Sequence, residues 1–408
     1  MKKKMLSMVL AFAMTASIFA GCGSTADSTD ADADTDAAET TEATESGDVA
    51  ASGDTWKIGG IGPITGAAAI YGNAARNGAQ IAIDEINEAG GINGSLIEYN
   101  FQDDEHDAEK SVNAYNTLKD WGMQILYGTV TTAPCLAVGA ETAADGIFEI
   151  TPSASSTDVL TDAGNVFQVC FTDPNQGIAS ANYISEHALA SKIAVIYDSS
   201  DVYSTGIYTT FKSTAESLGL ELVSETAFTA DNNTDFSVQL QQAKDAGAEL
   251  VFLPFYYQQA AIVLKQAKDM DYAPIFWGVD GMDGILTLEN FDTSLAEGVV
   301  LLTPFAADAT DEATVSFVTK YNEAYGETPN QFAADGYDAI YVIKEAIETS
   351  GVTVDMTAQD MAPALIEAMT SISVDGLTGT GMTWSAAGEV SKGPKAVKIE
   401  NGVYVSMD

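Results

Sequence analysis

Short hydroxyl side chains and one acid stand directly after segments that are typical of strands. GTVTTAP places Thr131 and Thr132 between a strand and a helix, and PSASS places its serines in an equivalent position. Small hydroxyls beside the free N–H groups of a helix N-terminus can hold a carboxylate. Asp280 in WGVDGMDG follows another strand, where a carboxylate can pair with a cationic group. On residue type alone the structural interpretation is stronger, with Thr132 and Ser155 as helix N-caps and Asp283 as a helix cap.

The glycine-rich run WKIGGIGPITGAAAIYG, residues 56–72, departs from a dinucleotide-binding fingerprint. That fingerprint needs G-x-G-x-x-G and an acid about 20 residues further on. Here the spacing from Gly60 is G-x-G-x-x-x-G, and Pro63 removes a backbone donor. The run therefore predicts a tight turn between a strand and a helix, from which Tyr71 can face a cleft.

The chain is poor in residues for covalent or metal chemistry. It contains two histidines, His106 and His187, and no G-x-S-x-G motif. Of three cysteines, Cys135 and Cys170 remain beside Cys22, and we expect two buried free thiols because their spacing does not demand a disulfide. We therefore expect no catalytic residues, no metal and no cofactor. A net charge of −42 also argues against nucleic acid and anionic lipid as partners.

The N-terminus has the pattern of a secretion signal followed by a spacer. In residues 1–22 three lysines precede an apolar stretch that is too short to span a bilayer. The stretch ends in FAGC, which resembles the lipobox of bacterial lipoproteins, so Cys22 is the expected lipidation site; a chance cysteine in an ordinary signal is the alternative. Residues 23–54 are acidic and nearly devoid of apolar side chains, which predicts a disordered tether. We expect an exported protein, anchored by lipid to the outer face of the cell membrane.

From residue 55 onward, short β-branched or aromatic runs alternate with amphipathic helical patterns, which predicts parallel sheets with helices on both faces. About 350 residues exceed one comfortable core, so we expect two lobes. The expected strands are 57–61, 97–103, 124–127, 147–150, 166–172, 192–197, 221–229, 249–253, 274–278 and 298–305. The expected helices include 73–89, 107–121, 175–188, 205–218, 235–246 and 258–270. A mostly helical stretch to residue 370 and a tail of β-hairpins complete the prediction.

The stretch KIGGIGPITGAAAIYGNAARNGAQIAIDEINEAGGING resembles the opening of the leucine/isoleucine/valine-binding proteins that serve ABC importers. That family typically opens with a strand, a G-P-[LI]-T-G turn, a Y-G pair and a helix ending D-x-I-N-x-x-G-G-I-x-G. The resemblance continues through IEYNFQDDEHDAEKSVNAYNTL, ITPSASSTDVL, VFQVCFTDPNQGIASANYI, KIAVIYDSSDVYSTG, LVFLPFYYQQAAIVLKQA, IFWGVDGMDG and GLTGTGMTWSAAGE. It covers essentially all of the chain after the tether.

The resemblance implies an α/β fold of the type I periplasmic binding protein class, with two Rossmann-like lobes and parallel sheets. Three crossing segments would join the lobes near 171–173, 303–305 and 384–388. The first lobe would comprise 55–172 plus 304–385, and the second lobe 173–303 plus 386–408.

The resemblance also implies a site for a free amino acid. The ligand carboxylate would meet Thr132, Ser153, Ala154 and Ser155. The ammonium would meet Asp280, at a place where much of the family has Glu. The ligand side chain would face Tyr71, Tyr203 and Tyr256, and Tyr257 could take the place of Tyr256.

Some family members lock a loop of this site with a disulfide. The matching stretches here read DDEHDA and GTVTTA, so this loop must be held in another way. We expect His106 on the surface or in a loop, and Arg76 on a solvent-facing side of its helix.

Taken together, the resemblance implies a solute-binding lipoprotein and not an enzyme. The protein would capture a small amino acid between closing lobes, with branched-chain aliphatic ligands as the family default, and deliver it to a membrane permease. Another amino acid, an amide, urea or an aromatic acid is the alternative ligand, because relatives with similar openings bind these. An exported hydrolase that uses Asp280 or Asp103 with a serine is the alternative from a different class. We expect a monomer.

Overall fold

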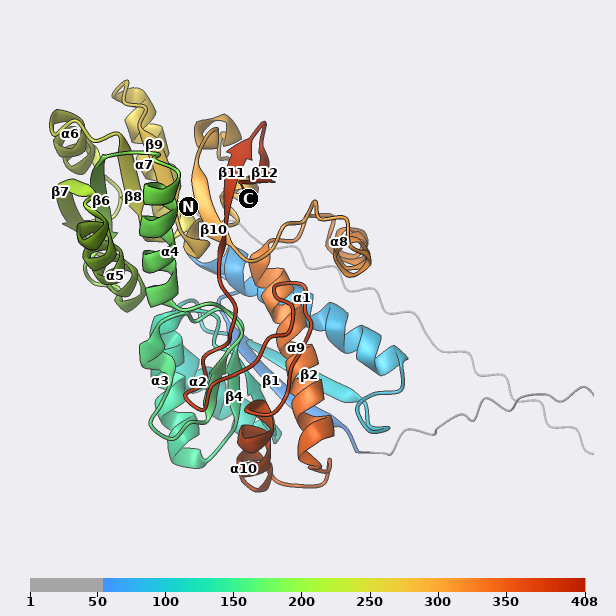
Figure 1. Ribbon diagram of the computed structural model, residues 1–408. Coiled ribbons are helices and arrows are strands. Elements are labelled where there is room, and N and C mark those ends of the chain that lie inside the picture. The colour runs from blue at the N-terminus through green and yellow to red at the C-terminus, as the bar shows by residue number, and fades with distance from the viewer. Residues whose placement is uncertain (1–53, 408) are drawn as a thin grey trace, which may run out of the picture. The chain divides into compact units, whose positions relative to one another are not determined.

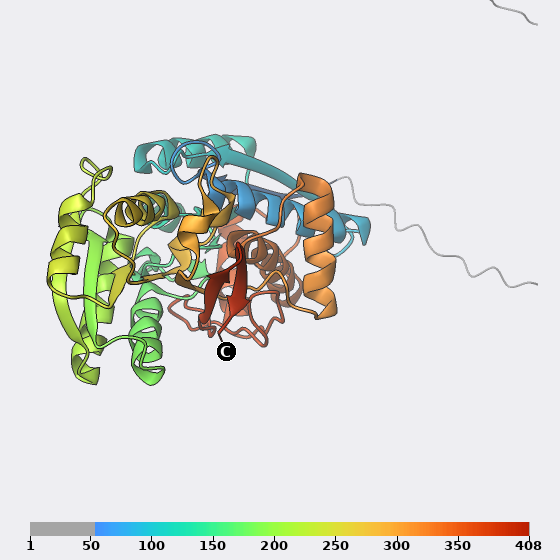
Figure 2. The same cartoon turned by 90° about the horizontal axis from the view of Figure 1, so that it is seen from above.

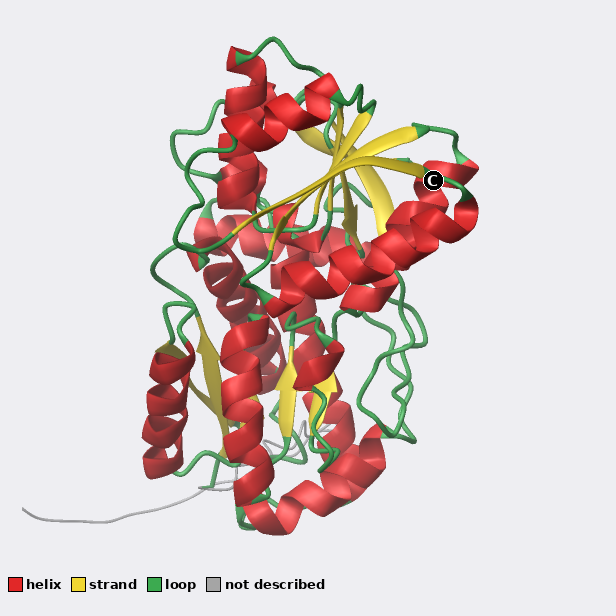
Figure 3. Ribbon diagram, turned by 90° about the vertical axis from the view of Figure 1, so that its left-hand side faces the viewer, coloured by secondary structure: helices red, strands yellow, loops and turns green. Residues whose placement is uncertain are grey.

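The computed structural model describes residues 54–407 (Figure 1). The predicted signal peptide, the predicted lipidation site Cys22 and the predicted tether up to residue 53 lie outside the described residues. Within residues 54–407, two sheets form the framework, and helices lie on both sides of the strands (Figure 3). We call each sheet with the helices packed on it a lobe.

The first lobe is built around a sheet that has five strands in the described part of the chain, in the order β2-β1-β3-β4-β5. All of its pairings are parallel. Its strands are β1 (Trp56–Gly62), β2 (Ile97–Asp103), β3 (Ile125–Tyr127), β4 (Glu149–Thr151) and β5 (Val166–Gln168). The helices α1 (Ala69–Glu88), α2 (Ala108–Trp121) and α3 (Thr132–Asp145) follow the first three of these strands. This βα alternation is what the sequence predicts.

The second lobe is built around a sheet with seven strands among the described residues, in the order β12-β11-β10-β9-β8-β6-β7. Its strands are β6 (Lys192–Asp198), β7 (Glu221–Phe228), β8 (Leu250–Leu253), β9 (Ile275–Gly278), β10 (Val300–Thr303), β11 (Lys395–Glu400) and β12 (Val403–Ser406). Strands β6 to β10 pair in parallel, whereas β11 and β12 are antiparallel. Its helices are α4 (Asp173–Glu186), α5 (Val202–Leu218), α6 (Ser237–Asp245) and α7 (Tyr257–Asp269).

After β10 the chain turns helical and returns to the first lobe with α8 (Glu312–Tyr325), α9 (Gln331–Ser350) and α10 (Ala358–Met369). Helix α9 lies beside α1 (Figure 1), and the two backbones touch where a glycine of each helix packs against an alanine of the other. A Cβ on Gly78 of α1 would lie 1.8 Å from the carbonyl oxygen of Ala333, and a Cβ on Gly336 of α9 would lie 2.4 Å from that of Ala75. Seen from above, α8 stands on the opposite side of the molecule from β6 and β7 (Figure 2).

Two expected elements differ from the structure. The predicted strand 166–172 ends at Gln168, because Asp173 and Pro174 start α4 and the residues between form isolated bonds such as Val169 N to Thr151 O. The glycine-rich tail forms isolated bridges at Val374–Met382 and Trp384–Val390, and only its end forms a regular hairpin, β11–β12. The lobe boundaries given above stay a prediction.

Candidate ligand-binding site

A small cavity of about 20 Å³ lies between the two lobes at the ends of the strands. Its walls are Tyr71, Val130, Thr131, Thr132, Ser153, Tyr203, Tyr256, Asp280, Gly281 and Phe332. Six of the eight predicted ligand-binding residues are among them. The other two, Ala154 and Ser155, lie fully buried behind Ser153 and do not line the cavity.

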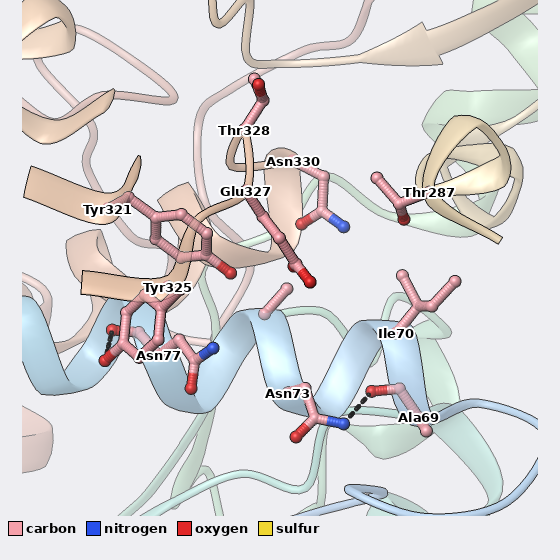
Figure 4. Close-up of a pocket in the computed structure, with 11 residues that line it drawn as sticks. Ala69, Ile70, Asn73, Asn77, Thr287, Tyr321, Tyr325, Glu327, Thr328 and Asn330 are labelled. Carbon is pink, nitrogen blue, oxygen red and sulfur yellow. Dashed lines mark hydrogen bonds between the residues drawn. The ribbon is translucent and has the colours of Figure 1, made fainter. Parts of the chain in front are cut away.

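A larger cavity of about 320 Å³ lies between α1 and the connection from α8 to α9 (Figure 4). Asn73 and Asn77 line it from α1, and Glu327 and Asn330 line it from the connection (Figure 4). The acid of this cavity, Glu327, is exposed, so the cavity does not pair a buried acid with a helix N-terminus. The smaller cavity carries both, and we therefore regard it as the ligand-binding site.

The hydroxyl wall of the small cavity comes from the loops after β3 and β4. Thr131 is the N-cap residue of α3, but its side chain makes no capping bond, and Thr132 is already the first helical residue. The side chain of Ser153 donates to the carbonyl of Val130 at 2.5 Å. The first N–H groups of α3 have no partner inside the helix. This wall therefore presents hydroxyls and amide donors together, which suits an anionic group.

The capping interpretation of these residues is wrong. Thr131, and not Thr132, occupies the N-cap position of α3. The short 3-10 turn Thr157–Val159 is capped by Ser156, whose side chain accepts from the N–H of Asp158, and not by Ser155. A run of adjacent Ser and Thr residues satisfies the capping preference at several positions, so residue type alone could not choose among them.

The acid wall is centred on Asp280, which starts a 3-10 turn after β9 and is 4% exposed. Its Oδ1 accepts from the hydroxyl of Tyr203 at 2.5 Å and from the N–H of Gly281 at 2.7 Å. Its backbone is held on both sides: its N–H donates to Oε1 of Gln176 at 3.0 Å, and its carbonyl accepts from Nε2 of Gln331 at 2.9 Å. Burial raises the pKa of Asp280 to about 6, against the hydrogen bonds that lower it.

Aromatic rings close the remaining sides of the cavity. Tyr203 and Tyr256 stack at 4.9 Å with nearly parallel planes, and Tyr71 packs 4.5 Å from Phe332. The neighbour of Tyr256 has a different task, because Tyr257 donates its hydroxyl to the carbonyl of Ala67 at 2.9 Å. Tyr256, and not Tyr257, therefore lines the cavity.

Tyr71 reaches across from the first lobe to the second. Its hydroxyl donates to the carbonyl of Gly281 and accepts from the N–H of Tyr257 at 3.3 Å. Gly72 makes this placement possible, because a Cβ there would lie 1.9 Å from the carbonyl oxygen of Pro63. Glycine thus lets α1 press against the turn after β1.

His106 is a partly buried loop residue, one of the two placements that the sequence predicts for it. It stands in the loop after β2, where its Nδ1 lies 2.8 Å from Oγ1 of Thr131. This bond joins the stretches DDEHDA and GTVTTA. Arg76 is partly buried and bonds to the side chain of its neighbour Asn77.

The remaining candidates of the sequence analysis have structural partners. Asp283 accepts from the N–H of Gly284 at 2.8 Å and from that of Gln331, at the start of α9, at 3.0 Å. Asp103 accepts from the N–H of Ile64 at 3.0 Å and holds the turn after β1, away from the walls of the cavity. Cys135 and Cys170 are buried free thiols, as expected.

Sequence reasoning missed Phe332, Gln176, Gln331 and the role of His106. Gln331 and Phe332 begin α9, about 50 positions after Asp280, and no local pattern connects them. Within residues 54–407, no cluster of His, Cys, Asp or Glu could hold a metal ion. None of the helices described is both long and apolar enough to cross a membrane.

The fold of two lobes recurs in known proteins. The family model described as periplasmic binding protein matches residues 55–402. This chain belongs to the periplasmic binding protein family.

Several relatives of this periplasmic binding protein are named after amino acids. A Leu/Ile/Val-binding protein homologue of Brucella melitensis is 30% identical over 318 residues, which cover 78% of this chain and 83% of the relative. A leucine-binding protein of Thermotoga maritima has a TM-score of 0.77 at 25% identity and covers 86% of this chain and 97% of its own. The isoleucine complex of a branched-chain amino acid binding protein from Streptococcus pneumoniae has a TM-score of 0.77 at 26% identity, with coverage of 86% and 99%. The chain is thus a binding protein of the ABC transporter class and not an enzyme, and its fold is the type I fold that the resemblance implied.

Proposed function

We propose that this periplasmic binding protein captures a small α-amino acid, in the first place a branched-chain aliphatic one, and delivers it to an ABC permease. The observation that carries this proposal is that Asp280 and the hydroxyls of Thr131, Thr132 and Ser153 line one cavity. An acid at one wall and donors at the other match the two charges of a zwitterion. The amino acids in the names of its relatives support the same choice.

Each wall of the cavity takes one part of the ligand. Thr131, Thr132 and Ser153, with the N-terminus of α3, bind the carboxylate. Asp280 binds the ammonium, and the rings of Tyr71, Tyr203 and Tyr256 enclose the side chain. Ala154 and Ser155 belong to the same loop but are fully buried outside the walls of the cavity, and the carbonyl of Ala154 accepts from Gln168 Nε2 at 2.7 Å.

Capture requires the lobes to move. A cavity of about 20 Å³ holds roughly one water molecule and not an amino acid with a carbon side chain. The lobes also contact each other directly, through Tyr71 with Gly281 and through Gln331 with Asp280. We propose that the crossing segments near 171–173, 303–305 and 384–388 act as hinges, and that ligand favours closure because only the closed form contacts it from both lobes.

The N-terminal features fit the same task. Removal of the signal at residues 1–22 and lipidation of Cys22 would keep the protein on the outer face of the membrane. The acidic segment 23–54 would then hold the binding lobes at a distance from the lipid.

The proposal is tested by identifying the ligand and by replacing Asp280, the acid proposed to bind its ammonium. Mass spectrometry of ligand released from the purified protein, followed by calorimetry with the twenty amino acids, is expected to identify at least one aliphatic amino acid. Asp280→Asn should then weaken its binding by roughly 30-fold or more, since removing one partner of a buried charged pair costs about 2–5 kcal/mol. Asp269→Asn, an exposed acid on α7, is the control and should bind like the wild type. Chemical conversion of the ligand, or retention of affinity in Asp280→Asn, would contradict the proposal.

A further inference from the structure

The loop after β2 is built to bring one imidazole back to the cavity. Asp103 accepts from the N–H of Glu105 at 3.0 Å, and Asp104 accepts from the N–H of His106 at 2.9 Å. These side-chain turns place Glu105 and His106 at φ values of +51° and +60°. Asp readily forms such turns, and His tolerates the left-handed region better than most residues do. The sequence DDEHD therefore fixes where the ring points.

The ring of His106 contacts two walls of the cavity without lining the cavity itself. Its Nδ1 lies 2.8 Å from Oγ1 of Thr131, in the loop after β3 of the first lobe. Its ring also meets Tyr256, which follows β8 in the second lobe, at 5.5 Å and nearly edge-on. Both partners line the cavity, whereas His106 is not among its walls.

We propose that His106 is a positioning residue of the ligand site, which holds the Thr131 hydroxyl and the Tyr256 ring in their binding arrangement. This inference rests on the proposed function. It adds to the site a residue that touches no ligand and acts through two residues that do.

The protonation state of the His106 imidazole decides whether the Thr131 hydroxyl can donate its proton to the ligand. Burial lowers the pKa of His106, against the nearby Asp107, which raises it, so the ring is neutral at neutral pH. A neutral ring carries one proton, and a hydroxyl has one proton to donate. When Nδ1–H donates to Oγ1 of Thr131, the hydroxyl proton of Thr131 remains free for an anionic group in the cavity. His106 thus turns Thr131 toward the ligand carboxylate.

The two contacts of His106 act at different steps. The bond to Thr131 stays within the first lobe, so it prepares the site before closure. The contact with Tyr256 bridges the lobes and exists only while they are closed, so it slows opening. Loss of the ring should therefore increase the dissociation rate of the ligand more than it decreases the association rate.

Three substitutions at one position separate these contacts. His106→Ala removes both; His106→Asn keeps an amide for Thr131 and suits a positive φ; His106→Phe keeps a ring for Tyr256. With L-leucine and L-isoleucine as probes, His106→Ala should bind about tenfold more weakly, the combined size of one hydrogen bond and one aromatic contact. Asn and Phe should each recover part of this loss. The exposed ring of His187 stacks on Tyr183. His187→Ala is therefore the control and should bind like the wild type.

Combining the His106 variants with substitutions of their contact partners gives the most decisive test. In a Thr131→Val protein, His106→Asn should bind no better than His106→Ala, because the amide has lost its partner. In a Tyr256→Ala protein, His106→Phe should bind no better than His106→Ala, because the ring has lost its partner. Stopped-flow kinetics and thermal unfolding of the ligand-free variants are recorded in parallel, since a purely structural role would lower the unfolding temperature and not depend on these partners.

Each outcome decides between the two proposals. A wild type that binds none of the twenty amino acids refutes the proposed function, and this inference with it. A wild type that binds, together with a His106→Ala that binds equally well, refutes the inference alone. Recovery by Asn that persists in the Thr131→Val background also overturns it.

Discussion

The hydroxyl of Tyr203 donates to Oδ1 of Asp280 across 2.5 Å, and both side chains are almost fully buried. Both residues belong to the second lobe, where Tyr203 stands on α5 and Asp280 follows β9. The hydrogen bond between Tyr203 and Asp280 is therefore made within one lobe, whereas Gln331 of the first lobe reaches the carbonyl of Asp280. The hydroxyl wall, with Thr131 and Ser153, is assembled separately in the first lobe.

Ligand affinity should fall in acid because Asp280 must be ionised to pair with an ammonium. Burial raises the pKa of Asp280 to about 6. Binding of an α-amino acid should thus be strongest above pH 6 and weaken as the pH falls, by up to about tenfold per pH unit. Calorimetry between pH 5 and pH 8 measures this slope.

A neighbouring acid supplies the control for this pH dependence. Burial raises the pKa of Asp201, the N-cap of α5, to about 6 as well. Asn caps a helix as well as Asp does, so Asp201→Asn should keep the slope, whereas Asp280→Asn should bind weakly and lose it. If the pH dependence of binding disappears in Asp201→Asn, Asp201 and not Asp280 is the group that titrates.

Protein stability should fall with rising pH through Glu149, an acid buried in β4. Burial raises its pKa from 4.5 to about 8, although the Thr142 hydroxyl donates to it at 2.6 Å. The folded protein therefore binds a proton more tightly than the unfolded chain, and the stabilisation present below pH 4.5 is lost as the pH rises to 8. Glu149→Gln cannot titrate and should be more stable than the wild type at pH 8, by on the order of 2 kcal/mol.

Urea unfolding at pH 5 and pH 8 measures the effect at Glu149. The exposed Glu141→Gln on α3 is the matched control, and it should follow the wild type at both pH values. An equal pH dependence in Glu149→Gln and in the wild type would contradict the prediction.

Gly72→Ala should disturb both the fold and the site. Its Cβ would lie 1.9 Å from the carbonyl oxygen of Pro63, so α1 would have to move and take Tyr71 with it. We expect a loss of about 1–3 kcal/mol in the free energy of unfolding, together with weaker ligand binding. Gly139→Ala on α3 is the control, because its Cβ would meet Thr161 Cγ2 at 3.6 Å and an Ala favours the helix. Similar unfolding midpoints for the two variants would show that the contact at Pro63 is unimportant.

Lys392→Met should destabilise the protein far more than removal of an exposed lysine. Nζ of Lys392 lies 2.6 Å from Oδ1 of Asp335 on α9, and both side chains are buried. Loss of the cation leaves Asp335 and its neighbour Asp338 buried without a counter-charge, which should cost about 3–5 kcal/mol.

The control for the buried pair is Lys265→Met. Lys265 pairs with Asp269 on α7, and both of their side chains are about two-thirds exposed. Chemical denaturation should show a change of less than about 1 kcal/mol for this variant. If Lys392→Met unfolds at the same denaturant concentration as Lys265→Met, the buried pair does not stabilise the fold.

The sequence was sufficient for the elements that follow a local pattern. Strand 97–103 was predicted with the bounds that β2 has, because polar and apolar residues alternate there between two clear turns. The strand expected at 166–172 was too long, because an apolar run does not show where its backbone bonds go. The bond of Gln168 N to Gly388 O, which ends this region, joins residues that are more than two hundred positions apart.

Candidate site residues were predictable where they follow strands, and not where tertiary contacts decide. Thr132, Ser153 and Asp280 stand at strand ends, where parallel sheets collect their ligands. Phe332 reaches the cavity, and Gln331 reaches the carbonyl of Asp280, only because α9 returns to α1, and no local signal in their own sequence indicates this. His106 lies in a loop as predicted, but its contacts with Thr131 and Tyr256 were not foreseen, because two aspartate turns direct its ring. The ligand contacts assigned to Thr132, Ser153 and Asp280 stay predictions.

The close contact of α1 with α9, in which a glycine of each helix packs against the backbone of the other, has a mechanical consequence. No side chain separates the two backbones at Gly78 and Gly336, so no change of rotamer can cushion a displacement of one helix past the other. Tyr71 near the start of α1 and Phe332 near the start of α9, whose rings pack 4.5 Å apart, are thereby carried as parts of a single stiff unit. Adjustment of the cavity to ligands of different size would then fall to the walls that this unit does not carry, Tyr256 after β8 and the backbone at Gly281 after β9.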